Sequence, residues 1–117
     1  MSELPPQVQN LVAQLQQIQQ QLQLVVGQKA QVEAMLEEAK QALEELQKVD
    51  ETATIYKAVG SILVKATKEN VVKELNEKKE SFEIRIKTLE RQEERLRERF
   101  AELQKKLQGF LGQPAAQ

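Results

Sequence analysis

Apolar residues recur along two long stretches of the chain in alternating steps of three and four. The first series spans Val8–Leu46, and eleven of its twelve positions are apolar, Lys29 being the exception. The second series spans Val72–Phe110, and ten of its twelve positions are apolar. A repeat of about 3.5 residues over such lengths predicts two long helices that pair in a left-handed coiled coil.

The two apolar series match each other when the helices run antiparallel. In this arrangement Val8 faces Phe110 and Leu46 faces Val72, and the steps of three and four coincide at all twelve layers. A shift by one heptad fits almost as well, so the pattern leaves the register open. Either register predicts a mainly α-helical fold built on a long antiparallel hairpin of two helices.

The stretch between the two series has a different character. Residues 52–66 lack the heptad repeat and are rich in β-branched side chains. Gly60-Ser61 suits a two-residue turn of type II′, in which the first central residue is glycine. We therefore expect a central β-hairpin with strands near 54–59 and 62–66.

Helix-breaking and capping residues indicate the remaining boundaries. Pro5-Pro6 stops the first helix from extending backward, and Thr67 is a suitable N-cap for the second helix. We expect a single domain over residues 1–117. Its predicted segments are a helix at 7–49, a β-hairpin at 52–66, a helix at 68–110 and a frayed tail at 111–117.

The predicted β-hairpin carries apolar side chains on both faces. An isolated two-stranded hairpin is only marginally stable in water, and its open edges invite pairing. One end of a coiled coil cannot cover both faces and both edges, so we expect hairpins from several chains to join in a shared sheet or β-barrel platform. A hairpin folded onto the helices of its own chain is the alternative. The side chains expected at the subunit interface are Ile55, Tyr56, Val59, Ile62, Leu63 and Val64.

The composition argues against catalysis, metal binding and membrane insertion. The chain has no His and no Cys, which removes the usual general base and the common zinc ligands. Its formal net charge is −1, and Lys and Arg alternate with Glu along the second helix, which is typical of a solvated surface and not of a phosphate track. No apolar run exceeds three residues, far short of the roughly 18 that span a bilayer. We expect a cytoplasmic protein that is not an enzyme, needs no cofactor or metal, and binds neither nucleic acid nor membrane.

Three charged residues, Lys29, Lys79 and Glu93, interrupt the apolar series. Long side chains can direct their charges outward while their methylenes cover the groove. Alternatively, polar residues in the seam set the register of a coiled coil at a cost in stability. Lys29 and Glu93 lie one layer apart when Val8 is paired with Phe110. The sequence leaves both interpretations open.

The helix ends at the two chain termini have an unusual composition. Residues 7–31 contain eleven Gln and one charged residue, Lys29. Because the end of a two-stranded coil cannot fully bury large side chains, we expect exposed apolar surface among neutral amides there. Such a surface usually marks a binding site, although the plain end of a zipper has the same pattern. The residues expected in this tip are Val8, Leu11, Val12, Leu15, Leu103, Leu107, Phe110 and Leu111.

Taken together, these features resemble the beta-type subunit of archaeal prefoldin. The segment from Ile55 to Lys65, IYKAVGSILVK, is similar to the hairpin signature of that family. The run from Lys78 to Glu93 is similar to its second helix. One β-hairpin between the helices, where the alpha type has two, favours the beta type. The resemblance covers essentially the whole chain.

The resemblance implies an ATP-independent molecular chaperone. In that family, two alpha-type and four beta-type subunits form a hexamer through their hairpins, and arms extend from the resulting barrel. The tips of the arms hold non-native client proteins and pass them to a group II chaperonin. The partners implied are therefore an alpha-type subunit, unfolded clients and a chaperonin. The alternative is a structural coiled-coil scaffold or tether that oligomerises through its β-hairpin.

Overall fold

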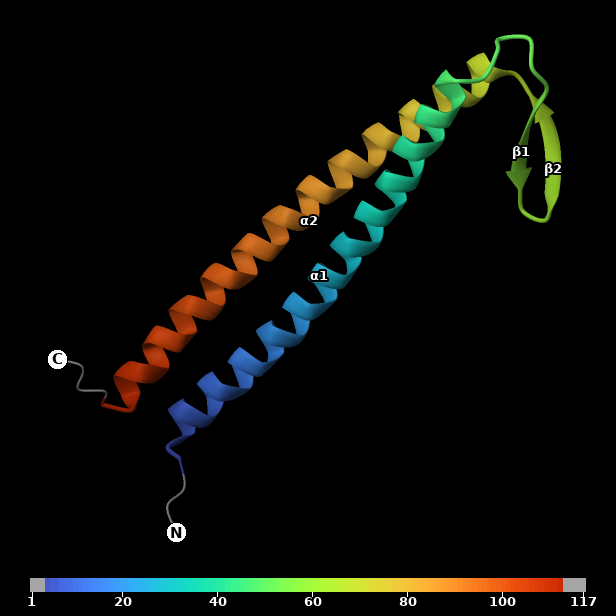
Figure 1. Cartoon of the computed structure of the whole chain (residues 1–117). Coiled ribbons are helices and arrows are strands. Elements are labelled where there is room, and N and C mark those ends of the chain that lie inside the picture. Colours follow the sequence, from blue (N-terminus) through green and yellow to red (C-terminus); the bar gives the residue numbers. More distant parts are fainter. Residues whose placement is uncertain (1–3, 113–117) are drawn as a thin grey trace. The chain divides into compact units, whose positions relative to one another are not determined.

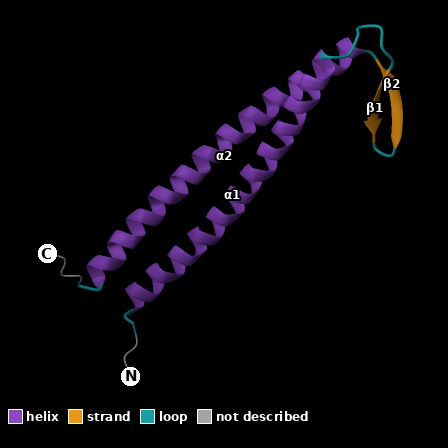
Figure 2. Cartoon of the chain, viewed as in Figure 1, coloured by secondary structure: helices purple, strands orange, loops and turns teal. Residues whose placement is uncertain are grey.

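A computed structural model describes residues 4–112 of the chain. In chain order, one β-hairpin lies between two long helices (Figures 1 and 2). The predicted fold class, mainly α-helical with a helical hairpin and a central antiparallel β-hairpin, is confirmed. Most of the tail expected at 111–117 lies outside the described residues. The elements in chain order are α1 (Pro6–Gln47), β1 (Ile55–Val59), β2 (Ile62–Ala66) and α2 (Lys68–Phe110).

Backbone hydrogen bonding explains where α1 begins and ends. Pro6 is the first helical residue, where the N–H that proline lacks has no helical partner in any case. The helix ends at Gln47, two residues before the expected position 49. The amides of Lys48 and Val49 donate to carbonyls three residues earlier, at 3.1 and 3.2 Å. The last turn therefore tightens before the chain leaves the helix.

A short polar loop joins α1 to the β-hairpin. The Asp50 carboxylate accepts hydrogen bonds from the backbone N–H and the hydroxyl of Thr52, at 2.8 and 2.9 Å. These bonds lower the pKa of Asp50 below its ordinary value. Lys68, at the start of α2, donates from Nζ to the carbonyl oxygen of Val49 at 2.9 Å. Side-chain hydrogen bonds thus hold the first half of the loop and connect it to the start of α2.

The β-hairpin turns where the sequence predicts. β1 and β2 pair antiparallel, from Ile55 opposite Ala66 to Val59 opposite Ile62. Gly60 has a φ of 62°, in the left-handed region that glycine adopts at the first central position of a primed hairpin turn.

A side-chain cap begins α2 directly after the β-hairpin. The Asn70 N–H donates to the Thr67 hydroxyl at 3.2 Å. This satisfies one of the free amide groups of the first turn, so Thr67 is the N-cap that the sequence predicts.

The described residues form two compact units, each with parts of both helices. The first unit combines the start of α1, up to Lys29, with the end of α2, from Thr88. The second unit, Ala30–Lys87, contains the remainder of the helices and the β-hairpin. The expectation of one domain over residues 1–117 stays a prediction.

The core of the first unit is the coiled-coil seam. Leu11, Ile18 and Leu103 form a buried apolar cluster that draws on both helices. All members of the cluster and its surroundings belong to the predicted heptad series. The partly buried residues packed against it are Leu15, Leu22, Leu96, Phe100 and Leu107.

A groove on the first unit indicates the register of the two helices. It is lined by residues between Gln21 and Val25 of α1 and between Gln92 and Leu96 of α2. Leu22 lies opposite Leu96 in the register that pairs Val8 with Phe110, and not after a shift by one heptad. The lining therefore agrees with the first of the two registers that the sequence allows.

The second unit also brings apolar side chains of both helices together. Val32 and Ala39 of α1 are buried. Ala39 and Met35 also line a groove together with Leu75 and Phe82 of α2. The heptad positions of both helices thus meet in this unit as well.

Candidate functional site

The β-hairpin of the single chain exposes most of its apolar side chains. Opposite residues of an antiparallel pair share a face, so Val59 and Ile62 point to one side of the sheet. Tyr56 and Leu63 point to the other side, as the strand alternation requires. Five of the six predicted interface residues are exposed and Ile55 is half-buried. Their role at a subunit interface stays a prediction.

One ion pair connects the β-hairpin to α2. The Lys57 ammonium donates to both carboxylate oxygens of Glu74, at 2.9 Å to Oε1. The hydrogen bond from Lys57 lowers the pKa of Glu74 below its ordinary value. The contact is polar, and the apolar hairpin side chains stay exposed beside it.

The expectation that the end of the coil cannot fully bury its large side chains does not hold for three of the tip residues. Val8 and Leu103 are only 2% and 1% exposed, and Leu11 is also buried. Leu103 packs in the cluster with Leu11 and Ile18, so both helices close the seam as far as this cluster. The remaining predicted residues Val12, Leu15 and Leu107 are half-buried.

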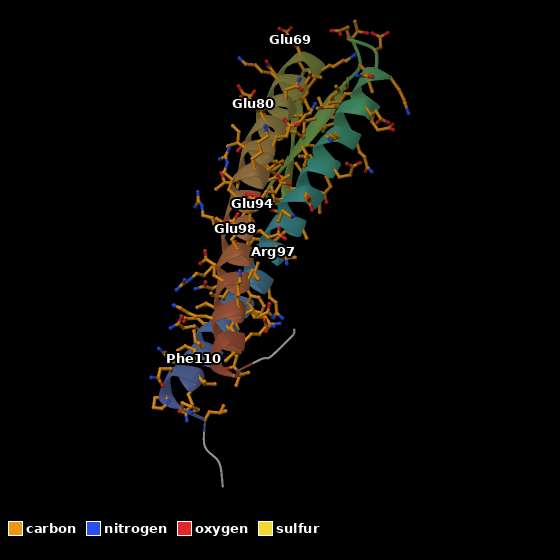
Figure 3. All side chains as sticks on the ribbon, turned by 90° about the vertical axis from the view of Figure 1, so that its left-hand side faces the viewer. Glu69, Glu80, Glu94, Arg97, Glu98 and Phe110 are labelled. Carbon is orange, nitrogen blue, oxygen red and sulfur yellow. The ribbon has the colours of Figure 1, made fainter. Side chains whose placement is uncertain are left out.

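The exposed apolar surface of the tip lies at its outermost turn. Phe110 and Leu111 are 53% and 54% exposed, as predicted, and Figure 3 labels Phe110 at the end of α2. Leu4 is exposed as well, and sequence reasoning missed it because it precedes Pro6, where the helix begins. We call Leu4, Phe110 and Leu111 the tip surface.

Two of the charged seam residues pair with each other. The Lys29 ammonium donates to Glu93 Oε1 at 2.9 Å, and Arg97 Nη2 donates to Glu93 Oε2 at 2.7 Å. The Glu93 side chain is only 15% exposed. The hydrogen bonds from Lys29 and Arg97 lower the pKa of Glu93 below its ordinary value. Lys29 and Glu93 are therefore satisfied inside the first unit and do not simply extend into water.

No feature of a metal site or membrane span is found in the described part of the chain. Residues 4–112 contain no group of three or more His, Cys, Asp or Glu side chains placed to hold a metal ion. Within the same residues, neither helix is long and apolar enough to cross a membrane.

Comparison with known proteins identifies the family. A model of the prefoldin subunit family matches residues 9–113. The chain is 71% identical to a prefoldin subunit beta of Archaeoglobus fulgidus, over 98% of this chain and 99% of that protein. It is 50% identical to the Pyrococcus furiosus subunit beta, over 99% of each chain. The crystal structure of the prefoldin beta subunit from Thermococcus strain KS-1 superposes with a TM-score of 0.89 at 48% identity, covering 97% of this chain and 100% of that one. The chain therefore belongs to the prefoldin subunit family, as a beta-type subunit of this non-enzymatic chaperone.

Proposed function

We propose that the chain captures non-native proteins with its tip surface, keeps them from aggregating without ATP, and passes them to a group II chaperonin. The exposure of Phe110 and Leu111 at the end of α2 is the observation that carries this proposal. Large apolar side chains that the coiled coil leaves in water are available to apolar segments of an unfolded chain. Family membership favours this role over the scaffold considered as the alternative.

The tip surface suits weak and repeated contacts. Burial of apolar surface contributes about 25 cal/mol per Å², and few large apolar side chains of one tip are exposed. A single tip therefore binds a client weakly, and useful affinity requires several arms on the same client. This requirement agrees with a chaperone that works as an assembly.

We propose further that the β-hairpin joins the subunits. Resemblance to the family supports a hexamer of two alpha-type and four beta-type subunits, located in the cytoplasm. The exposed hairpin side chains and the unpaired outer edges of β1 and β2 in the described chain are what such an interface requires. Hairpins of neighbouring subunits would cover both.

The tip proposal is tested with a double substitution, Phe110→Ser with Leu111→Ser. The assembled chaperone is mixed with a chemically unfolded protein without nucleotide, and aggregation is followed by light scattering. We expect the double variant to assemble normally and to lose most of its protection. Val26→Ser, which removes an exposed apolar side chain of α1 outside the tip, is the matched control. Full protection by the double variant would contradict capture at the tip.

The assembly proposal is tested with Ile62→Lys and Val64→Lys in one chain. The variant is mixed with an alpha-type subunit, and its mass is measured by analytical ultracentrifugation. We expect the assembly to be lost while the far-ultraviolet circular dichroism of the helices is retained, because neither residue packs in the coiled-coil seam. A full assembly of the double variant would contradict an interface at the hairpin.

A further inference from the structure

A groove on one side of the first unit exposes apolar surface that the coiled coil does not use. We call it the flank groove, and its volume is about 340 Å³. Leu24 is 62% exposed, more than any other large apolar side chain of α1 or α2 in residues 4–112. The residues lining the flank groove are Gln21, Leu24, Val25, Gln92, Arg95 and Leu96.

The position of Leu24 in the sequence explains its exposure. The heptad series passes through Leu22 and Val25, so Leu24 points away from the seam and contributes nothing to helix pairing. Val25 and Leu96 line the same groove, and Val25 is buried in the helix contact. Leu24 is therefore not an isolated surface residue, because it forms one continuous apolar surface with the seam residues Val25 and Leu96.

The flank groove has one charged residue in its lining. Arg95 lines it, and no carboxylate does. From residue 4 to residue 28, α1 and the segment before it carry no charge at all. Arg95 makes no ion pair with the residues that the structure describes. Its guanidinium is thus available to an anion from outside the chain.

The carboxylates of this part of α2 lie around a different groove. Glu90, Glu94 and Glu98 line it together with Arg97. Figure 3 labels Glu94, Arg97 and Glu98 along α2. Glu90, Glu94 and Glu98 lie four residues apart along one side of the helix, whereas Arg95 directly follows Glu94 and lies on another side. Glu98 is three residues from Arg95, but no ion pair joins these two described side chains. The two grooves of this stretch of α2 therefore differ in charge.

We propose that the flank groove binds a segment of an unfolded client in which an apolar side chain stands next to an Asp or Glu. The proposal rests on the proposed chaperone function and defines the class of client segment. The apolar side chain packs on Leu24, Val25 and Leu96, and the carboxylate accepts hydrogen bonds from Arg95. An Arg guanidinium matches a carboxylate with two parallel N–H···O bonds. A segment carrying Lys or Arg at the same place meets repulsion and is disfavoured.

The test uses two short unfolded peptides that differ only in Glu or Lys beside the same apolar residues. Binding to the assembled chaperone is measured by fluorescence anisotropy in low salt. We expect the Glu peptide to bind about two- to fivefold more tightly, the range of a partly exposed ion pair. We also expect the preference to shrink as salt is raised, because exposed charges are screened.

Two substitutions and one control assign the preference to the flank groove. Arg95→Gln should remove the preference, and Leu24→Gln should weaken binding of both peptides. Glu94→Gln, a similar change on the other groove, should leave the preference in place. No preference in the natural protein, or a preference that survives Arg95→Gln, would overturn the proposal. Equal binding of an acidic peptide without apolar residues would also overturn it, because the groove would then be only an anion site.

The tip variant separates this proposal from the proposed function. Phe110→Ser with Leu111→Ser removes exposed apolar surface of the tip and leaves the flank groove intact. If that double variant loses protection of clients but keeps the Glu preference, both proposals are supported. If it protects clients fully and keeps the preference, capture at the tip is wrong and the flank groove stands. Loss of the preference for the Glu peptide in the double variant would place the charge selection at the tip and overturn the proposal for the flank groove.

Discussion

Leu103→Ala should be among the most destabilising single changes in the first unit. The side chain is 1% exposed and lies in the buried cluster with Leu11 and Ile18. Truncation to Ala removes three buried carbon atoms, each of which contributes about 0.8 kcal/mol to the free energy of unfolding, or roughly 2.4 kcal/mol together. The cavity that remains adds to this loss of stability. Two paired helices can close partly over such a gap. We therefore expect a loss of about 2–3 kcal/mol, at the low end of the range for buried leucines.

The matched control is Leu111→Ala, the same chemical change on a residue of the same unit. Leu111 is 54% exposed, so the loss should stay below about 1 kcal/mol. Both variants are unfolded with urea as full-length chains at one protein concentration, because the stability of an oligomer depends on concentration. Helix content is followed by circular dichroism. Losses that agree within about 0.5 kcal/mol would refute the inference that the seam is closed up to Leu103.

Further substitutions test the turn, the cap, the helix interior and the seam charges. Gly60→Ala should lower the free energy of unfolding by about 1–2 kcal/mol, since φ is 62° at this position. Gly27→Ala should raise the free energy of unfolding by about 0.4–1 kcal/mol, because the helix favours Ala and a Cβ at this position meets open space. Thr67→Ala should cost about 1 kcal/mol through the lost N-cap bond; all three are measured by urea unfolding. The pKa of Glu93 is lowered in the folded chain, so its stabilising effect is present above its unfolded pKa and is lost as pH falls through the folded value. Thermal unfolding at a series of pH values below about 6 should therefore show a smaller loss of stability on acidification for Glu93→Gln than for the natural protein, and equal losses would contradict the ion-pair account.

Local patterns in the sequence were enough to predict most of the fold. The heptad series predicts both helices, and Gly60 and Thr67 predict the turn and the cap, because each depends on neighbours close along the chain. The antiparallel pairing follows from the match between the two series. The absence of His and Cys likewise predicts a protein that is not an enzyme, in agreement with the family.

The tertiary structure alone decided which side chains are exposed and which charges meet. Leu103 is buried and Phe110 is exposed although both occupy heptad positions. Val8, which the register places opposite Phe110, is buried, so position in the series alone does not determine burial. Lys29 and Glu93 are far apart in the sequence, so only the packed helices reveal that one neutralises the other. The exposure of Leu24 beside Arg95 has the same origin. A groove is formed by two helices together, and the pattern of either helix by itself does not contain it.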